Sequence, residues 1–190
     1  GESARDSLTH LAHGADAICF FQWRQSVAGA ERFHSAMVPH AGPDSAVFRG
    51  VVELGATLRG LAEVAGSRRV PARAAILFDW PSWWAAEQPF TPNAELRYKA
   101  EALGWYTAFL DAGVRADVLP ADAPLTGYEL VLAPVLHLVG PARRAALSGY
   151  VEAGGHLVST YFSGTVDEDA HVWPGGYPGA LRELLGIRVE

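Results

Sequence analysis

The last 117 residues alternate short apolar runs with longer amphipathic segments, and this alternation limits the possible fold more than any other feature. Apolar runs at 74–78, 116–119, 130–133 and 156–162 predict strands. The intervening segments at 95–112 and 141–153 have helical spacing, and 178–185 predicts a last short helix. Strands that alternate with helices form a mainly parallel sheet with right-handed crossovers. We therefore predict an α/β fold.

The predicted helices have clear ends. The first places Leu96, Leu103, Tyr106 and Leu110 on one apolar stripe and stops at Gly113. The second has a proline at its first position and a Gly-Gly pair after its end. These signals favour a flavodoxin-like layered domain over 74–190, with helices on both faces of the sheet.

The first part of the chain is a shorter piece of the same kind of pattern. Residues 5–13 predict a helix, 15–22 a buried strand, and a second helix begins at Asp44 or Ser45 and runs to about residue 65. One strand cannot close a core without neighbours. The Gly-, Pro- and Arg-containing segment 66–73 is typical of a linker between two domains.

Polar and aromatic side chains crowd the loop that follows the predicted strand. Phe21 and Trp23 offer flat apolar faces, and Glu31 and His34 lie three residues apart. A carboxylate can accept two sugar hydroxyls, and an imidazole can donate to one hydroxyl and accept from another. The set therefore suits a pyranose ring. The alternative is a surface ion pair between Glu31 and Arg24 or Arg32.

Two other groups of residues allow a functional and a plain interpretation. His10 and His13, with Asp6 one turn earlier, could offer three metal ligands, or they could form a solvated helix face. We favour the solvated face, because no second-shell partner is evident, and we predict no metal and no cofactor. Three tryptophans, Trp80, Trp83 and Trp84, follow the first strand of the second part. They could line a ligand site at the carboxyl end of the sheet or make a protein–protein contact.

Composition excludes several classes of function. The net charge of −6 and a single lysine, Lys99, argue against nucleic-acid binding. The sequence contains no run of about 18 apolar residues of the kind that predicts a membrane span, and the N-terminal residues have no signal-peptide core. We therefore expect a cytoplasmic location. The only cysteine, Cys19, is expected to be a buried, inert thiol. Because no cysteine follows Cys19, His137 and Glu129 have no thiol nucleophile to assist. The second part of the chain is therefore expected to have no catalytic site.

Several long stretches resemble one family. "AHGADAICFFQWRQSVAGAERFHSAMVPHAG" is similar to the last barrel strand and following loop of the glycoside hydrolase family 42 β-galactosidases. "ILFDWPSWWAAE", "YELVLAPVLHLV", "YVEAGGHLVSTYFSGTVDE" and "VWPGGYPGALRELLGIRVE" resemble that family's trimerisation domain. The resemblance implies that 1–65 are the C-terminal part of a (β/α)₈ TIM barrel, 66–73 a linker, and 74–190 a flavodoxin-like domain of the class I glutamine amidotransferase-like type.

The resemblance also assigns roles. Phe21, Glu31 and His34 match positions of the galactose subsite, Trp23 belongs to the same motif, and the partners become a β-galactoside and a homotrimer. The family uses two glutamates in a retaining mechanism, and both match positions on earlier barrel strands. The sequence therefore predicts a fragment of a β-galactosidase that lacks both catalytic glutamates and is inactive alone. The alternative is a stand-alone, non-catalytic assembly or carbohydrate-binding module.

Overall fold

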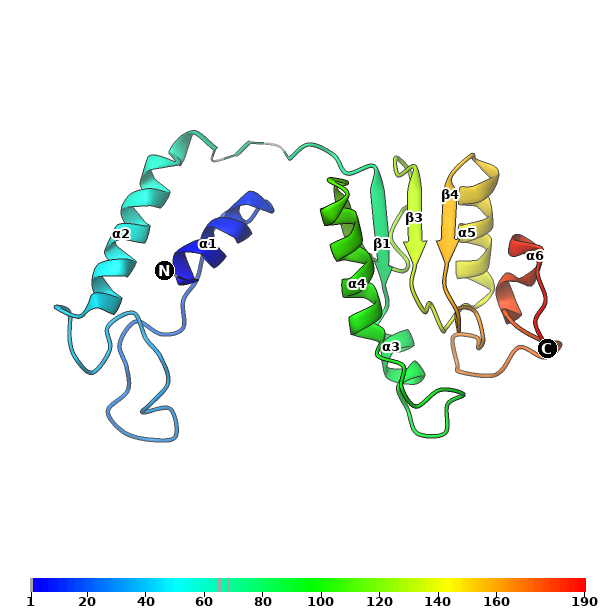
Figure 1. Ribbon diagram of the computed structural model, residues 1–190, viewed down its shortest axis with the longest axis horizontal. Helices are drawn as coiled ribbons and strands as arrows, with labels where there is room; N and C mark the ends of the chain where they lie inside the picture. Colours follow the sequence, from blue (N-terminus) through cyan, green and yellow to red (C-terminus); the bar gives the residue numbers. More distant parts are fainter. Residues whose placement is uncertain (1, 65, 68) are drawn as a thin grey trace. The chain divides into compact units, whose positions relative to one another are not determined.

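The structure, a computed structural model, describes residues 2–64, 66–67 and 69–190. The chain forms two compact units, Gly1–Val70 and Pro71–Glu190. In Figure 1 the first unit is blue to cyan and the second runs from green to red.

The first unit contains two helices joined by a long irregular segment. Helix α1 spans Glu2–Ala12, α2 spans Ala46–Gly60, and a 3₁₀ turn, η1, covers Ala62–Val64. The predicted N-cap is confirmed, because the Ser45 side chain accepts a hydrogen bond from the backbone N–H of Phe48 at 3.2 Å. The predicted end of this helix, residue 65, lies outside the described residues, and α2 itself stops at Gly60.

The predicted strand at 15–22 is wrong. Within the described residues this segment is irregular, and the only pairing nearby is an isolated parallel bridge between Arg24 and Val38. A strand exists only where a neighbouring segment supplies hydrogen bonds along its length, and among the described residues only the backbone N–H of Met37 bonds across to this segment, at the Gln22 carbonyl. Its apolar side chains are consequently uncovered: Phe20 is 39% exposed. Cys19 is also exposed, so the expectation of a buried thiol is wrong.

The second unit holds a four-stranded parallel sheet in the order β2-β1-β3-β4. Its strands are β1 (Ala74–Phe78), β2 (Ala116–Pro120), β3 (Leu130–Ala133) and β4 (His156–Ser159). This is the predicted parallel sheet in a flavodoxin-like order, and the predicted fold class is confirmed. The first and third strands match the predicted ranges residue for residue. The fourth ends at Ser159 rather than 162, and Phe162 has a left-handed backbone with φ of 59°.

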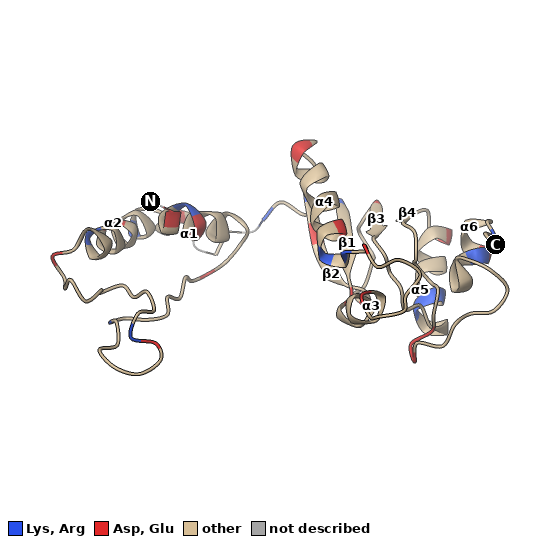
Figure 2. Ribbon diagram, turned by 60° about the horizontal axis from the view of Figure 1, so that its bottom comes forward, with Lys and Arg blue, Asp and Glu red and all other residues tan. Residues whose placement is uncertain are grey.

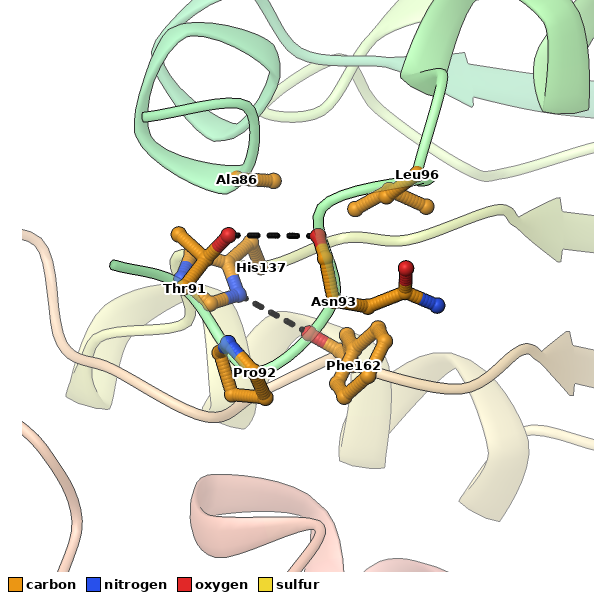
Figure 3. A pocket seen from close by; sticks show the side chains of 7 residues that line it. All are labelled: Ala86, Thr91, Pro92, Asn93, Leu96, His137 and Phe162. Atoms are coloured by element: carbon orange, nitrogen blue, oxygen red, sulfur yellow. Dashed lines mark hydrogen bonds between the residues drawn. The ribbon is translucent and has the colours of Figure 1, made fainter. Parts of the chain in front are cut away.

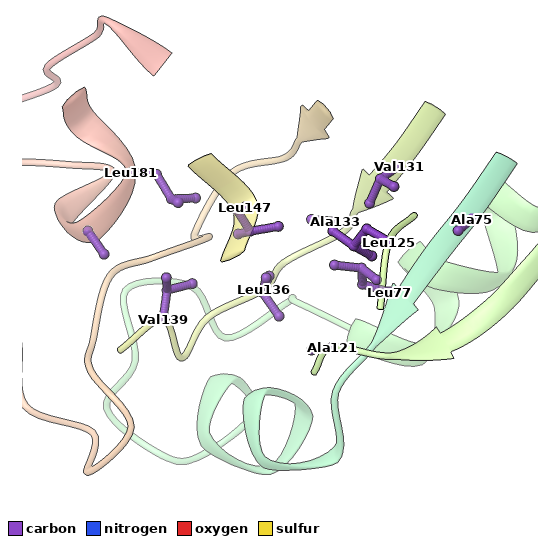
Figure 4. Close-up of a cluster of buried hydrophobic side chains, with 11 residues drawn as sticks. Ala75, Leu77, Ala121, Leu125, Val131, Ala133, Leu136, Val139, Leu147 and Leu181 are labelled. Atoms are coloured by element: carbon purple, nitrogen blue, oxygen red, sulfur yellow. The ribbon is translucent and has the colours of Figure 1, made fainter. Parts of the chain in front are cut away.

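Helices cover both faces of the sheet, as predicted. Helix α5 (Pro141–Glu152) packs on one face, where Leu77 of β1 and Leu147 of the helix belong to one buried cluster (Figure 4). On the other face α4 (Tyr98–Asp111) brings Tyr98 against Phe78, with ring centroids 5.3 Å apart. The main cluster comprises Ala75, Leu77, Ala121, Leu125, Val131, Ala133, Leu136, Val139, Leu147, Ala180 and Leu181.

Three details of the second unit differ from the sequence prediction. The stripe predicted for α4 is only partly right: Leu96 is buried and Tyr106 half-buried, but Leu103 and Leu110 are 58% and 62% exposed. The helix itself buries Tyr98 and Ala102. Helix α3 (Trp80–Ala86) was not predicted at all. The last predicted helix is split into a 3₁₀ turn, η2 (Gly179–Leu181), followed by α6 (Arg182–Leu185).

Candidate functional site

The loop between α1 and α2 brings together two of the predicted sugar-binding residues. The rings of Phe21 and His34 meet edge to face, with centroids 5.2 Å apart and planes at 85°. The backbone N–H of His34 donates to the carbonyl of Glu31 at 2.9 Å, so these two residues share one turn. Phe21 is 63% exposed, and both Glu31 and His34 are exposed as well. The three side chains therefore remain accessible to a ligand.

Hydrogen bonding fixes which atom of the His34 ring is available. Its Nδ1 lies 2.9 Å from the carbonyl oxygen of Ser35. A carbonyl only accepts hydrogen bonds, so in the neutral ring Nδ1 carries the proton and Nε2 is an acceptor. The Glu31 carboxylate is an acceptor too. The pair is suited to a ligand that presents hydroxyl hydrogens, such as a sugar.

Trp23 occupies a different environment. Its ring meets Phe48 of α2 edge to face, with centroids 6.0 Å apart, and it remains 60% exposed. Within the described residues no ion pair joins Glu31 to Arg24 or Arg32, and the Arg32 guanidinium donates instead to the carbonyl of Gly29 at 2.8 Å. The structure therefore gives no support to the ion-pair interpretation of Glu31.

The histidines of α1 do not gather into a ligand set. The Asp6 carboxylate accepts a hydrogen bond from the Arg5 guanidinium at 3.2 Å, and His13 lies just after the helix end. In the part of the chain that the structure describes, no group of three or more His, Cys, Asp or Glu side chains is placed to hold a metal ion.

The three tryptophans of α3 divide into two kinds. Trp83 is half-buried and stacks on Tyr98, with centroids 6.3 Å apart and planes at 10°. Trp80 and Trp84 are 55% and 63% exposed. Trp83 therefore belongs to the packing of the second unit, whereas the rings of Trp80 and Trp84 face solvent.

His137 and Glu129 lie at opposite ends of β3 and cannot act together. Glu129, which precedes the strand, pairs with Arg73, and this partner lowers the pKa of the carboxyl. His137 follows the strand and lines a small pocket with Thr91, Asn93 and Phe162 (Figure 3). Burial lowers the pKa of His137, and its Nδ1 donates to the Phe162 carbonyl at 3.1 Å. The other residues lining the pocket are Ala86, Pro92 and Leu96.

Sequence analysis missed a buried polar network at the carboxyl end of the sheet. The Asp79 side chain accepts from the backbone N–H of Ser82 at 2.9 Å and from both terminal nitrogens of Arg143 at 3.2 Å. Arg143 also contacts Asp122, and its Nη1 donates to the carbonyl of Leu138 at 2.7 Å. An Asp followed by a proline two residues later is an N-cap signal that would have revealed α3. These bonds hold the backbone at Ser82 and Leu138 in place, and the network contains no free nucleophile.

Acidic and basic residues are interspersed along the ribbon of both units (Figure 2). Across the described ranges, no helix is both long and apolar enough to cross a membrane.

The structure shows an α/β chain in two parts: an exposed, polar and aromatic loop between two helices, and a flavodoxin-like domain. Comparison with known families agrees with this division. Residues 1–61 match the model described as β-galactosidase, and residues 72–190 match the β-galactosidase trimerisation domain. The chain belongs to glycoside hydrolase family 42.

Individual relatives cover the whole chain. It is 50% identical over 190 residues to a β-galactosidase from an Arthrobacter species, and 45% identical over 192 residues to β-galactosidase BbgII of Bifidobacterium bifidum; each match covers 100% of the chain. The crystal structure of a β-galactosidase from Rahnella sp. R3 superposes with a TM-score of 0.91 at 45% identity, covering 98% of the chain. The chain spans 27–28% of the length of these three proteins.

Proposed function

We propose that this chain is part of a retaining β-galactosidase that hydrolyses terminal β-D-galactosyl residues. In this proposal residues 1–65 are the C-terminal part of the catalytic barrel, 66–73 a linker and 74–190 the trimerisation domain. The protein assembles as a homotrimer in the cytoplasm. The observation that carries the proposal is the exposed contact between Phe21 and His34, with Glu31 in the same turn.

The residues of the loop bind and orient the sugar in this proposal. Phe21 stacks on the apolar face of the galactose ring. Glu31 accepts a hydrogen bond from one hydroxyl, and Nε2 of neutral His34 accepts from another, because its Nδ1–H is committed to Ser35. Trp23 is assigned to the same site by family resemblance, although its ring meets Phe48 rather than Phe21 or His34. Contacts of this kind raise the rate when they tighten as the ring distorts toward the transition state.

The chemistry itself comes from outside these 190 residues. A retaining glycosidase needs an acid/base carboxyl and a nucleophilic carboxylate, about 5–5.5 Å apart. By family resemblance both are glutamates on earlier barrel strands, so the chain alone is inactive. The competing proposal, a stand-alone carbohydrate-binding or assembly module, has no specific observation in its favour.

The test uses the full-length protein and an activated aryl β-galactoside. Glu31→Ala is expected to lower kcat/KM by ~10²-fold, as for a group that orients the substrate. Glu53→Ala, an exposed glutamate on α2, is the matched control and should leave kcat/KM unchanged. Sedimentation equilibrium on the same samples is expected to give three times the chain mass. Wild-type kinetics in Glu31→Ala would contradict the sugar-binding role of Glu31. Turnover by the 190-residue chain alone would contradict the assignment of both catalytic glutamates to earlier barrel strands.

A further inference from the structure

The site loop, residues 26–37, is closed at its base by two short segments that lie side by side. The backbone N–H of Val38 donates to the Trp23 carbonyl at 2.8 Å, and the N–H of Gln25 donates to the Val38 carbonyl at 3.0 Å. The N–H of Met37 donates to the Gln22 carbonyl at 2.8 Å. Val38 is only 2% exposed, so this base is the buried part of an otherwise open loop.

Side chains, not backbone groups alone, complete the base. The Gln25 amide oxygen accepts from the backbone N–H of His40 at 2.8 Å. The His40 ring reaches back, and its Nε2 lies 2.8 Å from the carbonyl oxygen of Ser26. Because a carbonyl only accepts, Nε2 of His40 carries the proton and donates. These two bonds join Gln25 and Ser26, where the chain enters the site loop, to His40, which follows the loop.

Little else holds the tip of the site loop. Residues 27–35 are all exposed, and they include Glu31 and His34. Among the described contacts, those that fix the tip are short turn bonds, the Arg32–Gly29 bond and the ring contact between Phe21 and His34. The direction in which the tip leaves the base therefore depends on the base itself, where the bonds made by Gln25 and His40 add to the three backbone bonds.

We infer that Gln25 and His40 are positioning residues for the galactoside: they hold the site loop so that Glu31 and His34 meet the sugar hydroxyls together. This inference rests on the proposed function, because it assigns the two residues an effect on sugar binding. Neither side chain needs to touch the substrate. Without the hydrogen bonds of Gln25 and His40 the loop tip becomes mobile, and a misplacement of about 1 Å is enough to weaken its contacts with the sugar strongly.

The experiment compares matched variants of the full-length protein. Gln25→Leu removes the acceptor, while Gln25→Glu keeps an oxygen there. His40→Phe removes the donor, while His40→Gln keeps an N–H that can reach Ser26. The disruptive variants are expected to lower kcat/KM at least tenfold, with a clear rise in both KM and the inhibition constant of free galactose. The conservative variants should stay within about threefold of wild type. His13→Phe, an exposed histidine of the same unit, is the control.

A combined variant shows whether Gln25 acts through Glu31 and His34. In a Glu31→Ala/His34→Ala background, Gln25→Leu should change KM by less than about twofold, because both groups it positions are gone. A purely structural role would instead lower the fraction of folded, active enzyme, which reduces kcat at unchanged KM. That pattern, or a wild-type KM in both disruptive variants, would overturn the inference.

The outcomes separate this inference from the proposed function. A folded full-length wild-type protein without activity on aryl β-galactosides would overturn the proposed function. An active wild type whose Gln25→Leu and His40→Phe variants bind galactose normally would overturn only the positioning role. If Gln25→Leu does not accumulate as folded protein by near-ultraviolet circular dichroism, His40→Phe decides the question.

Discussion

The hydroxyl of Tyr98 accepts a hydrogen bond from the backbone N–H of Asp79 at 2.8 Å, in the buried core of the second unit. Tyr98 is 0% exposed and Asp79 is 6% exposed, so water cannot replace this contact. The bond ties the start of α4 to the residue that caps α3, directly after β1. It therefore fixes the point at which the chain leaves the carboxyl end of the sheet.

Tyr98→Phe is expected to destabilise the fold by about 1–3 kcal/mol, because it leaves a buried N–H without an acceptor. The ring contacts with Phe78 and Trp83 are kept, so the loss reports the hydrogen bond alone. Urea unfolding followed by near-ultraviolet circular dichroism measures the difference. Tyr106→Phe on the same helix is the control and should stay within ~0.5 kcal/mol of wild type.

The same residue predicts a loss of stability in alkaline solution. Burial raises the pKa of Tyr98 to about 12, and the hydrogen bond to Glu101 raises the pKa of Tyr161 to about 12. In the unfolded chain both tyrosines ionise near pH 10.0. Between these values the folded state keeps protons that the unfolded state has lost. The contribution of these groups is thus complete below pH 10 and falls as the pH rises toward 12.

Urea midpoints measured from pH 9 to pH 12 check this expectation. Wild type should lose stability most steeply, and the double variant Tyr98→Phe/Tyr161→Phe should show the flattest decline. An equal slope in both proteins would show that other groups control the alkaline limit. The Tyr161 effect should be the smaller of the two, because that side chain is half exposed to solvent.

A third prediction concerns the ion pair between Asp79 and Arg143. Their side chains are 7% and 15% exposed, and the two oxygens and two nitrogens meet in a bidentate pair. Asp79→Asn leaves a nearly buried guanidinium without its main counter-charge and should cost about 3–5 kcal/mol. Asp122 contacts the same guanidinium but is 77% exposed, so Asp122→Asn should cost less than ~1 kcal/mol. Urea titration of the two variants measures both losses of unfolding free energy. Equal losses would show that burial of the carboxylate does not set the cost.

The strands of the sheet could be predicted from sequence because each is an apolar run that polar or turn residues bound. Both β1 and β3 fall on their predicted residues. The buried face of α4 could not be predicted in this way. Leu103 and Leu110 have helical spacing, yet the helix turns Tyr98 and Ala102 inward, because Tyr98 packs on Phe78 and bonds to Asp79. Tertiary contact, not periodicity, selects that face.

The candidate site shows the same difference between what the sequence pattern predicts and what tertiary contacts decide. Its residue types suggested a sugar, because carboxylate, imidazole and aromatic rings are the groups that bind one. Their arrangement depends on hydrogen bonds between residues about fifteen apart, such as His40 to Gln25, which leave no periodic pattern in the sequence. The predicted strand at 15–22 failed for a related reason, since a strand requires a partner that the apolar run itself does not specify. The galactose-binding roles of these residues stay a prediction.

A fourth prediction separates the tryptophans of α3. Trp83→Ala removes a half-buried ring that stacks on Tyr98, and it should destabilise the second unit by about 3 kcal/mol. Trp84 is 63% exposed, so Trp84→Ala should cost less than ~1 kcal/mol. Thermal unfolding of the two variants compares them directly. A large loss of stability in Trp84→Ala would mean that its ring is covered in the assembled protein.

The last prediction uses two glycines that share a left-handed backbone but differ in their surroundings. Gly127 has φ of 93° with no atom within 4 Å of the position a Cβ would occupy, whereas at Gly179, with φ of 52°, that position lies 2.2 Å from the carbonyl oxygen of Gly164. Gly127→Ala should therefore cost only the backbone strain, about 1–2 kcal/mol. Gly179→Ala adds a clash with backbone and should cost more than ~4 kcal/mol. Because both variants add the same methyl group, the difference between their urea midpoints isolates the close approach of residues 164 and 179. A difference of zero would mean that the turn around Gly179 relaxes freely.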